Sequence, residues 1–237
     1  MKVLLVYAHE EPHSFNAAMK NTAIKTFEAA GHSVVVSDLY RMTFKAVADG
    51  DDFLERRDRH YLKRQFEEQA ASTLGTLAHD ILDEQEKLKD CDLLILQFPL
   101  WWFSMPAIMK GWVDRVMTMG FAYGGGKWYD EGGLKGKRAM LAVTTGGPEA
   151  SYLERGINGS MEKVLFPIQH GILFFCGFDV LDPFVAWGPA HQDQDSRTKV
   201  LNRYAEVLSG IETRERVPFH PLAHYDKGLQ LKAEFEP

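Results

Sequence analysis

Four runs of nearly continuous apolar residues stand out along the chain, at positions 3–8, 33–39, 93–98 and 139–145. Runs of this kind are typical of strands that are covered on both faces, as in a parallel sheet. Between the first two runs, residues 16–30 have the length of a crossover helix, with Ser14 or Asn16 as its N-cap and Gly31 at its end. These elements predict one βαβ unit.

Further helices are predicted from Pro106 to Val116 and over residues 163–176 and 197–211, and a fifth strand over residues 180–187. This alternation predicts an α/β fold, namely a flavodoxin-like, doubly wound sheet of five parallel strands with helices on both faces. Ligands bind to such sheets beyond the carboxyl ends of the strands.

Two stretches lie outside this scheme. Residues 49–69 are densely charged, and residues 213–237 contain several prolines and histidines. We therefore expect one flavodoxin-like domain over residues 1–212, followed by a C-terminal tail over residues 213–237 that packs on a dimer or is mobile. No repeat or change of composition indicates a second independent domain.

Charge and composition narrow the possible functions. The 237 residues carry a formal net charge of −6, which argues against nucleic acid as the main ligand. Cys91 and Cys176 are far apart and form neither a disulfide framework nor a thiolate metal cluster. The longest apolar stretch, residues 93–103, is shorter than the ~20 residues of a spanning helix. We expect a soluble, cytoplasmic protein without membrane insertion.

The unusual residues gather where the first, third and fourth predicted strands end. Residues 9–16 lead into a helix N-terminus, where free N–H groups attract phosphate. Residues 99–106 hold three consecutive aromatic residues between two prolines, and residues 144–148 form a glycine turn whose amides are open to a ligand. Singly, these features are a helix cap, an aromatic cluster and a tight turn. Together they describe a pocket that suits a flavin nucleotide.

Two short motifs resemble the signatures of a zinc protease and of a phosphate-binding loop, but their surroundings in the sequence do not fit either. Residues 9–13 match the H-E-x-x-H signature of zinc proteases, but Pro12 makes this segment a loop, whereas the signature needs a helix. Residues 124–127 lack the spacing and the Ser or Thr of a phosphate-binding loop. His220 and His224 are interpreted as residues of a solvated tail.

The ordered residues at these positions resemble those of the NAD(P)H:quinone acceptor oxidoreductases, the DT-diaphorase family. The resemblance rests on the following residues: His9, Ser14-Phe15-Asn16, Gln97-Phe98-Pro99-Leu100, Trp102-Phe103, Lys110-Gly111-Trp112, Asp114-Arg115, Thr144-Thr145-Gly146-Gly147, Tyr152, Phe166-Pro167-Ile168-Gln169-His170-Gly171 and Phe175-Cys176-Gly177-Phe178. It covers most of the chain.

The resemblance implies tightly bound FAD, with FMN less expected, and a homodimer whose active site lies at the subunit interface. It implies NAD(P)H as co-substrate and two-electron, ping-pong hydride transfer to a quinone or similar small acceptor. The implied cofactor-binding residues are His9, Ser14, Phe15, Asn16, Ala17, Ala18, Pro99, Leu100, Trp101, Trp102, Phe103, Thr144, Thr145, Gly146, Gly147, Tyr152 and Arg197.

The resemblance also implies individual roles. The amides of Gly146 and Gly147 and the hydroxyl of Tyr152 would stabilise the anionic reduced flavin as catalytic groups. The implied substrate-binding residues are Tyr123, Trp128, Asn158 and Phe175. Arg197 would lie near the adenosine half of FAD, although it could also be an ordinary exposed helix arginine.

The chain departs from the family at three points. Asn158 stands where the main branch has a histidine of the proton relay, and asparagine takes up no proton at neutral pH. A second branch, which shares this asparagine, is poor with ordinary nicotinamide dinucleotides, so the donor stays open. That branch binds a metal through two histidines and a cysteine; His170 matches the first ligand, but Phe174 occupies the second position, so we expect no metal. Gly124, Gly125 and Gly126 replace a bulkier segment and open the pocket mouth.

Other functions remain alternatives. A flavin or azo-dye reductase would use the same pocket with another acceptor. A regulatory subunit of an ion-efflux system would dock to a membrane efflux protein, for which the charged residues 49–69 offer a surface. A passive electron carrier would lack the additional chain after the fourth strand.

Overall fold

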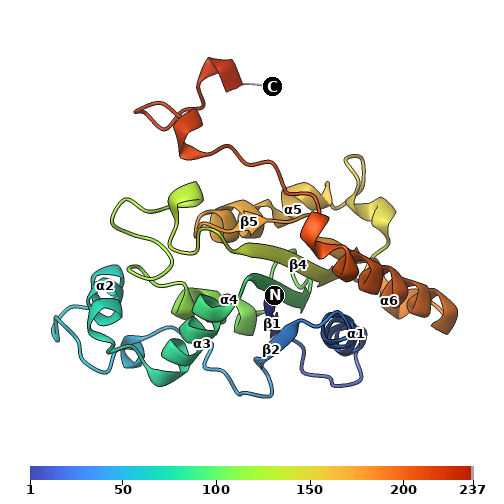
Figure 1. The fold of residues 1–237 in the computed structure, drawn as a ribbon, viewed down its shortest axis with the longest axis horizontal. Helices are drawn as coiled ribbons and strands as arrows, with labels where there is room; N and C mark the ends of the chain where they lie inside the picture. The colour runs from blue at the N-terminus through green and yellow to red at the C-terminus, as the bar shows by residue number, and fades with distance from the viewer. Residues whose placement is uncertain (236–237) are drawn as a thin grey trace.

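The structure is a computed structural model and describes residues 1–235. Its centre is a parallel sheet in the order β2-β1-β3-β4-β5, with β6 also paired to β4 (Figure 1). The strands are β1 (Lys2–Tyr7), β2 (Ser33–Asp38), β3 (Leu93–Pro99), β4 (Arg138–Thr144), β5 (Asp179–Val180) and β6 (Phe184–Ala186). The predicted flavodoxin-like order is confirmed.

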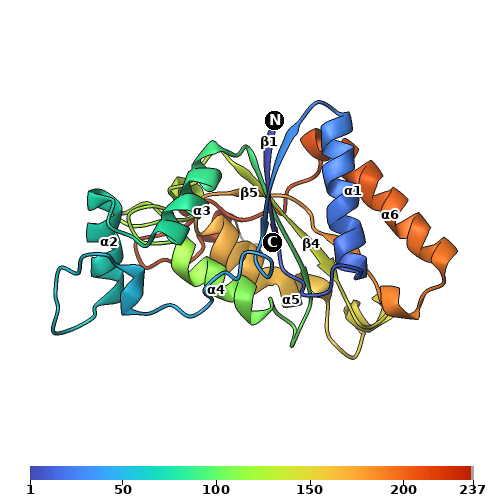
Figure 2. The same ribbon diagram turned by 90° about the horizontal axis from the view of Figure 1, so that it is seen from below.

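Helices cover both faces of this sheet (Figure 2). Within residues 1–235 the α-helices are α1 (Phe15–Ala29), α2 (Arg64–Leu74), α3 (His79–Asp90), α4 (Ala107–Val116), α5 (Met161–Ile168) and α6 (Gln194–Ser209). Among them, none combines the length and the apolar character needed to cross a bilayer.

Alternating strand residues decide which helix packs where. Val3 and Leu5 of β1 are buried in the core cluster that includes residues of α1 and α6, whereas Leu4 and Val6 are buried in the cluster formed with α3, α4 and α5. Each central strand is thus apolar on both faces. The four strand predictions from continuous apolar runs are confirmed, with ends shifted by at most one residue, although the edge strand β2 is partly exposed.

The fifth strand differs from the prediction of one element over residues 180–187. It is split into β5 and β6, which pair with the two ends of β4. Pro183 lies in the break and has no N–H to donate to a sheet. The carbonyl oxygens of Asp182 and Pro183 instead accept hydrogen bonds from the Arg214 side chain at 2.7 and 2.8 Å.

The charged residues 49–69 are folded onto the body through buried ion pairs. The carboxylate of Asp52 is fully buried and accepts hydrogen bonds from Arg64 Nη2 at 2.6 Å and from Arg115 Nε at 2.9 Å. Arg64 also contacts Glu68, whose other oxygen accepts from the Met119 N–H at 3.0 Å. The segment therefore belongs to the fold, and its end forms the start of α2.

Further helical regions differ from the prediction. Helices α2 and α3 were not predicted. The buried face of α3 carries Glu84 and Gln85, which are paired by Trp112 Nε1 and the Val116 carbonyl oxygen respectively. The helix predicted over residues 163–176 consists of α5 followed by a π-helical segment, Gln169–Phe174. Beyond α6, residues 215–217 pair with residues 180–182 at the edge of the sheet, and the rest of the C-terminal tail extends from there as an arm (Figure 1).

Candidate functional site

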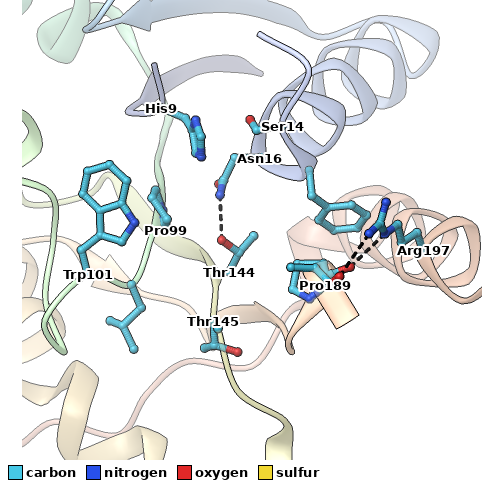
Figure 3. Close-up of a pocket in the computed structure, with 13 residues that line it drawn as sticks. His9, Ser14, Asn16, Pro99, Trp101, Thr144, Thr145, Pro189 and Arg197 are labelled. Atoms are coloured by element: carbon cyan, nitrogen blue, oxygen red, sulfur yellow. Dashed lines mark hydrogen bonds between the residues drawn. The ribbon is translucent and has the colours of Figure 1, made fainter. Parts of the chain in front are cut away.

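A cavity of about 420 Å³ lies where β1, β3, β4 and β6 end at the same edge of the sheet (Figure 3). It brings together most of the cofactor-binding residues that the sequence predicts. The residues that line it are His9, Ser14, Phe15, Asn16, Pro99, Leu100, Trp101, Thr144, Thr145, Gly146, Pro189, Ala190 and Arg197.

The start of α1 supplies the predicted anion-binding end of the cavity. Ser14 is the N-cap, as expected: its Oγ accepts from the Ala17 N–H at 3.1 Å, and its carbonyl oxygen accepts from the Ala18 N–H at 3.1 Å. The N–H groups of Phe15 and Asn16 donate to no acceptor within residues 1–235. These two amides, rather than those of Ala17 and Ala18, are therefore available to a phosphate.

Asn16 connects this helix to the neighbouring strand end. Its Nδ2 donates to Thr144 Oγ1 at 2.7 Å, and its carbonyl oxygen accepts from the buried Gln97 Nε2 at 2.6 Å. Its Oδ1 is buried and has no partner within the described residues. An unpaired buried oxygen costs free energy, so this atom fits a ligand that donates a hydrogen bond.

His9 faces the cavity from the end of β1. Its Nδ1 accepts from the Glu11 N–H at 3.0 Å, which places the proton of a neutral imidazole on Nε2 and leaves that N–H free to donate. Its ring lies 6.2 Å from that of Trp101. Residues 9–13 form turns before α1, so the two histidines of the H-E-x-x-H match share no helix face.

The aromatic turn after β3 is strained and exposed. Trp102 and Phe103 adopt positive φ angles of 51° and 58°, which costs a residue with a side chain about 1–3 kcal/mol. Their exposed fractions are 96% and 51%. Trp101 lines the cavity, whereas Trp102 and Phe103 do not. Strain combined with exposed rings is typical of a surface that is covered by a ligand or a partner.

The glycine turn after β4 presents two free amides. Thr145 Oγ1 donates to the Gly147 carbonyl oxygen at 2.8 Å and accepts from the Gly188 N–H at 3.2 Å, which fixes the turn. The N–H groups of Gly146 and Gly147 have no acceptor within residues 1–235. A Cβ on Gly147 would lie 3.7 Å from the ring of Tyr152, so this tyrosine adjoins the amides. Gly147 and Tyr152 do not line the cavity itself.

Arg197 lies at the end of the cavity opposite Trp101 (Figure 3). Its Nε donates to the Pro189 carbonyl oxygen at 2.8 Å and its Nη2 to the Ala190 carbonyl oxygen at 3.4 Å (Figure 3). Pro189 and Ala190 also line the cavity, and the sequence reasoning missed them. They follow the last strand, so the rule applied to the other strand ends would have found them.

Three predicted substrate residues meet elsewhere, as an aromatic wall. The Phe175 ring lies 5.3 Å from that of Tyr123 and 6.3 Å from that of Trp128. Tyr123 and Phe175 line a second cavity of about 590 Å³, and burial raises the pKa of the Tyr123 hydroxyl. Neither residue lines the first cavity, so one chain does not unite the two groups. Asn158 lines neither cavity; its N–H donates to the carbonyl oxygen of Ser151, the residue before Tyr152, at 2.9 Å.

Comparison with known proteins gives the relationship. The flavodoxin-like fold model matches residues 1–208. Human ribosyldihydronicotinamide dehydrogenase [quinone] is 43% identical over 92% of this chain and 94% of that protein. NAD(P)H dehydrogenase [quinone] 1 of Cavia porcellus is 41% identical over 99% of this chain and 87% of that protein. The chain belongs to the NAD(P)H:quinone oxidoreductase family.

The solved structures agree with this membership. A protein from Klebsiella pneumoniae described as a quinone reductase has a TM-score of 0.97 and 46% identity, and the match covers 100% of this chain and 96% of that one. The structure of NAD(P)H:quinone oxidoreductase from Methanothermobacter marburgensis has a TM-score of 0.71 and 26% identity. As a member of the NAD(P)H:quinone oxidoreductase family, the chain is an oxidoreductase of a flavoprotein family.

Proposed function

We propose that the chain catalyses the two-electron reduction of a quinone or similar small acceptor by a reduced nicotinamide, through a bound flavin. The observation that carries this proposal is the pair of free amides at Gly146 and Gly147, which lie at the same sheet edge as the free amides of α1. The names of the relatives, quinone dehydrogenases and quinone reductases, support the acceptor class.

A flavin held in this cavity would supply two-electron hydride chemistry, in which negative charge develops on its ring system and would need a stabilising partner. The N–H groups of Gly146 and Gly147 are preorganised donors of the kind that stabilise such a charge, and the adjacent Tyr152 hydroxyl is proposed as a third donor. The unpaired Oδ1 of Asn16 and the His9 Nε2 supply one acceptor and one donor to the cofactor.

We propose FAD rather than FMN as the cofactor. The cavity extends from the start of α1 to Pro189, Ala190 and Arg197, beyond the region that a single phosphate would need. Arg197 fixes the backbone there and thereby shapes a surface for the adenosine half. NADH, NADPH and a nicotinamide without a second nucleotide are the candidate donors.

We propose further that the active site is completed in a homodimer. Tyr123, Trp128 and Phe175 form an aromatic wall that does not line the flavin cavity of its own chain. In this arrangement the wall of one copy faces the flavin of the other, and the exposed Trp102 and Phe103 are covered. Asn158, whose N–H is bonded to the residue before Tyr152, is proposed to orient the acceptor by hydrogen bonding. The cytoplasmic location and the absence of a metal stay predictions.

The alternative functions are not favoured. The azoreductase structures from Bacillus anthracis and of AzrA share 17 and 18% sequence identity with the chain, which shows a common fold alone. A regulatory docking surface on residues 49–69 would need charges that are free to contact a partner. Several of these charges are paired inside the chain, since Arg64 binds Asp52 and Glu68, and Asp52 also binds Arg115.

The test is an absorption spectrum of the purified chain, followed by anaerobic NADH and then menadione. Flavin bands that bleach with NADH and return with menadione are expected. Extraction and chromatography of the released flavin distinguish FAD from FMN. Bleaching by dihydronicotinamide riboside alone would assign a donor without the second nucleotide. A chain that binds no flavin after reconstitution would contradict the proposal.

A further inference from the structure

The C-terminal tail packs behind the aromatic wall. A third cavity, of about 170 Å³, lies between the tail and the segment that carries Trp128. Its lining comes from Trp128, Tyr129 and His170 on one side and from four tail residues on the other, His220, Leu222, Tyr225 and Leu229. Trp128 therefore faces Phe175 with one part of its ring and the tail with another.

Two anchors hold the tail at this place. The Leu222 N–H donates to Asp130 Oδ1 at 2.7 Å, and Asp130 follows Trp128 by two residues. Before that point, Phe219 packs against three rings of α5 and the π-helical segment: its ring centroid lies 6.2 Å from that of Phe166, 5.0 Å from His170 and 5.1 Å from Phe174. The second anchor consists of ring contacts, and two of its rings, His170 and Phe174, also pack against Tyr129 at 5.2 and 5.5 Å.

The backbone that leads to Trp128 is poorly restrained by side chains. Gly124, Gly125 and Gly126 all have positive φ angles, and a Cβ added to Gly125 or Gly126 would meet nothing within 4 Å. Trp128 itself is 39% exposed. Backbone hydrogen bonds hold this approach, between Gly124 and Lys127 in both directions and from the Tyr129 N–H to the Phe175 carbonyl oxygen at 2.8 Å. The glycines offer no side chains against the Trp128 ring, so the orientation of the ring depends on Phe175 and on what packs behind it.

We propose that Asp130 is a positioning residue for the acceptor site, and that it holds the tail residues Leu222 and Tyr225 as the outer wall behind Trp128. The tail thereby determines which acceptors the aromatic wall accommodates. This inference rests on the proposed function, since it assigns Trp128 to the acceptor wall. It adds a role for the tail to that function.

Three variants separate the hydrogen bond from general effects. Asp130→Ala removes the acceptor, and Asp130→Asn retains a carbonyl oxygen at the same place. Glu131→Ala removes the neighbouring carboxylate, whose one ion pair within residues 1–235 is with exposed Lys135. With menadione, Asp130→Ala is expected to raise KM by about five- to tenfold, the effect of one hydrogen bond, with kcat nearly unchanged. Asp130→Asn is expected to have a KM close to that of the wild type, and Glu131→Ala is expected to have the same KM as the wild type.

A spectroscopic readout follows the ring directly. In protein labelled with 5-fluorotryptophan, the ¹⁹F resonance of residue 128 is assigned by its loss in Trp128→Phe. We expect this resonance to shift in Asp130→Ala and to stay in place in Glu131→Ala. Flavin content of the purified holoprotein is expected to be equal in all variants.

The outcomes are distinguishable. An unmoved resonance in Asp130→Ala overturns the positioning role, and a moved resonance with an unchanged KM overturns the link to acceptor binding. Failure of the proposed function has a different signature, because the wild type and every variant would then lack quinone turnover while the fluorine shifts could still differ. In that case the proposal that Trp128 and the aromatic wall bind the acceptor is also overturned.

Discussion

Asn16 Nδ2 donates to Thr144 Oγ1 across 2.7 Å, which joins the helix after β1 to the end of β4. The two residues are 128 positions apart in sequence, and β3 lies between their strands in the sheet. The bond orients a buried amide whose Oδ1 has no partner within residues 1–235. One pair thus fixes the relative position of the anion-binding end and the glycine turn.

Substitution of Asn16 tests this arrangement. Asn16→Ala removes both the link and the unpaired oxygen, and we expect flavin affinity to fall about tenfold, the equivalent of ~1.4 kcal/mol. The free energy of unfolding of the apoprotein should change by less than this amount. The substitution removes the bond to Thr144, but it also removes a buried oxygen that has no partner within residues 1–235. Flavin fluorescence titration measures the affinity. Asn21→Ala, on the exposed face of the same helix, is the control and should bind as wild type. Equal affinities would argue against contact between Asn16 and the cofactor.

Arg197 is expected to act through the loop that it holds. Arg197→Ala frees the carbonyl oxygens of Pro189 and Ala190, and we expect about a tenfold loss of FAD affinity with a smaller effect on FMN. Arg197→Lys should bind FAD almost as weakly as Arg197→Ala, because an ammonium group lacks the planar fork with which the guanidinium reaches both carbonyl oxygens. Lys199→Ala, exposed on the same helix, serves as the control. Equal losses for FAD and FMN would place Arg197 away from the adenosine half.

The buried Asp52 carboxylate predicts a pH-dependent stability. Burial alone would raise its pKa, but hydrogen bonds from Arg64 and Arg115 outweigh burial and lower it. Its contribution is therefore fully present above the ordinary carboxyl pKa of about 4 and is lost as the pH falls through the lowered value.

Asp52→Asn removes the buried anion that Arg64 and Arg115 share, while Arg64 keeps Glu68 and Arg115 keeps Asp80 as partners. We expect this change to lower the free energy of unfolding by about 3 kcal/mol at neutral pH. The difference from wild type should shrink in acid, where the wild-type carboxyl is protonated. Urea denaturation across this pH range measures it. Asp51→Asn changes the exposed neighbour and should have little effect. A difference that stays constant with pH would show that the charge is not responsible.

Gly111 predicts a steric effect on folding. A Cβ at this position of α4 would lie 2.1 Å from the Ala46 carbonyl oxygen, a backbone atom that cannot move aside easily. We expect Gly111→Ala to destabilise the chain by more than about 3 kcal/mol. Gly171→Ala, whose Cβ would meet nothing within 4 Å, is the matched control. Thermal unfolding of the two variants gives the comparison, and similar melting temperatures would contradict the close packing.

The sequence predicted the sheet because β1, β3 and β4 are buried on both faces, which leaves runs such as residues 93–98 without polar interruption except Gln97, whereas the edge strand β2 is partly exposed. It did not predict α3, whose inner face carries Glu84 and Gln85. These polar side chains are satisfied by Trp112 and Val116, residues that only the tertiary structure brings near. Local pattern cannot anticipate such partners.

The candidate site shows the same division. His9, Asn16 and Thr144 were predicted because they follow strands, and a topological rule needs no side-chain detail. That Ala17 and Ala18 donate to Ser14 while Phe15 and Asn16 keep free amides is set by helix capping geometry. The separation of the aromatic wall from the flavin cavity depends on how distant loops pack, which the sequence does not reveal.

The break at Pro183 also bears on how the chain behaves at high concentration. A long, regular edge strand offers unpaired backbone groups to other molecules and promotes aggregation. Here the edge beyond β4 consists of strands of two and three residues, and Arg214 occupies carbonyl oxygens between them. Residues 215–217 also pair with residues 180–182. Within residues 1–235 a neighbouring chain therefore finds no continuous free strand to extend on this side of the sheet, and the interruption protects the chain from aggregation.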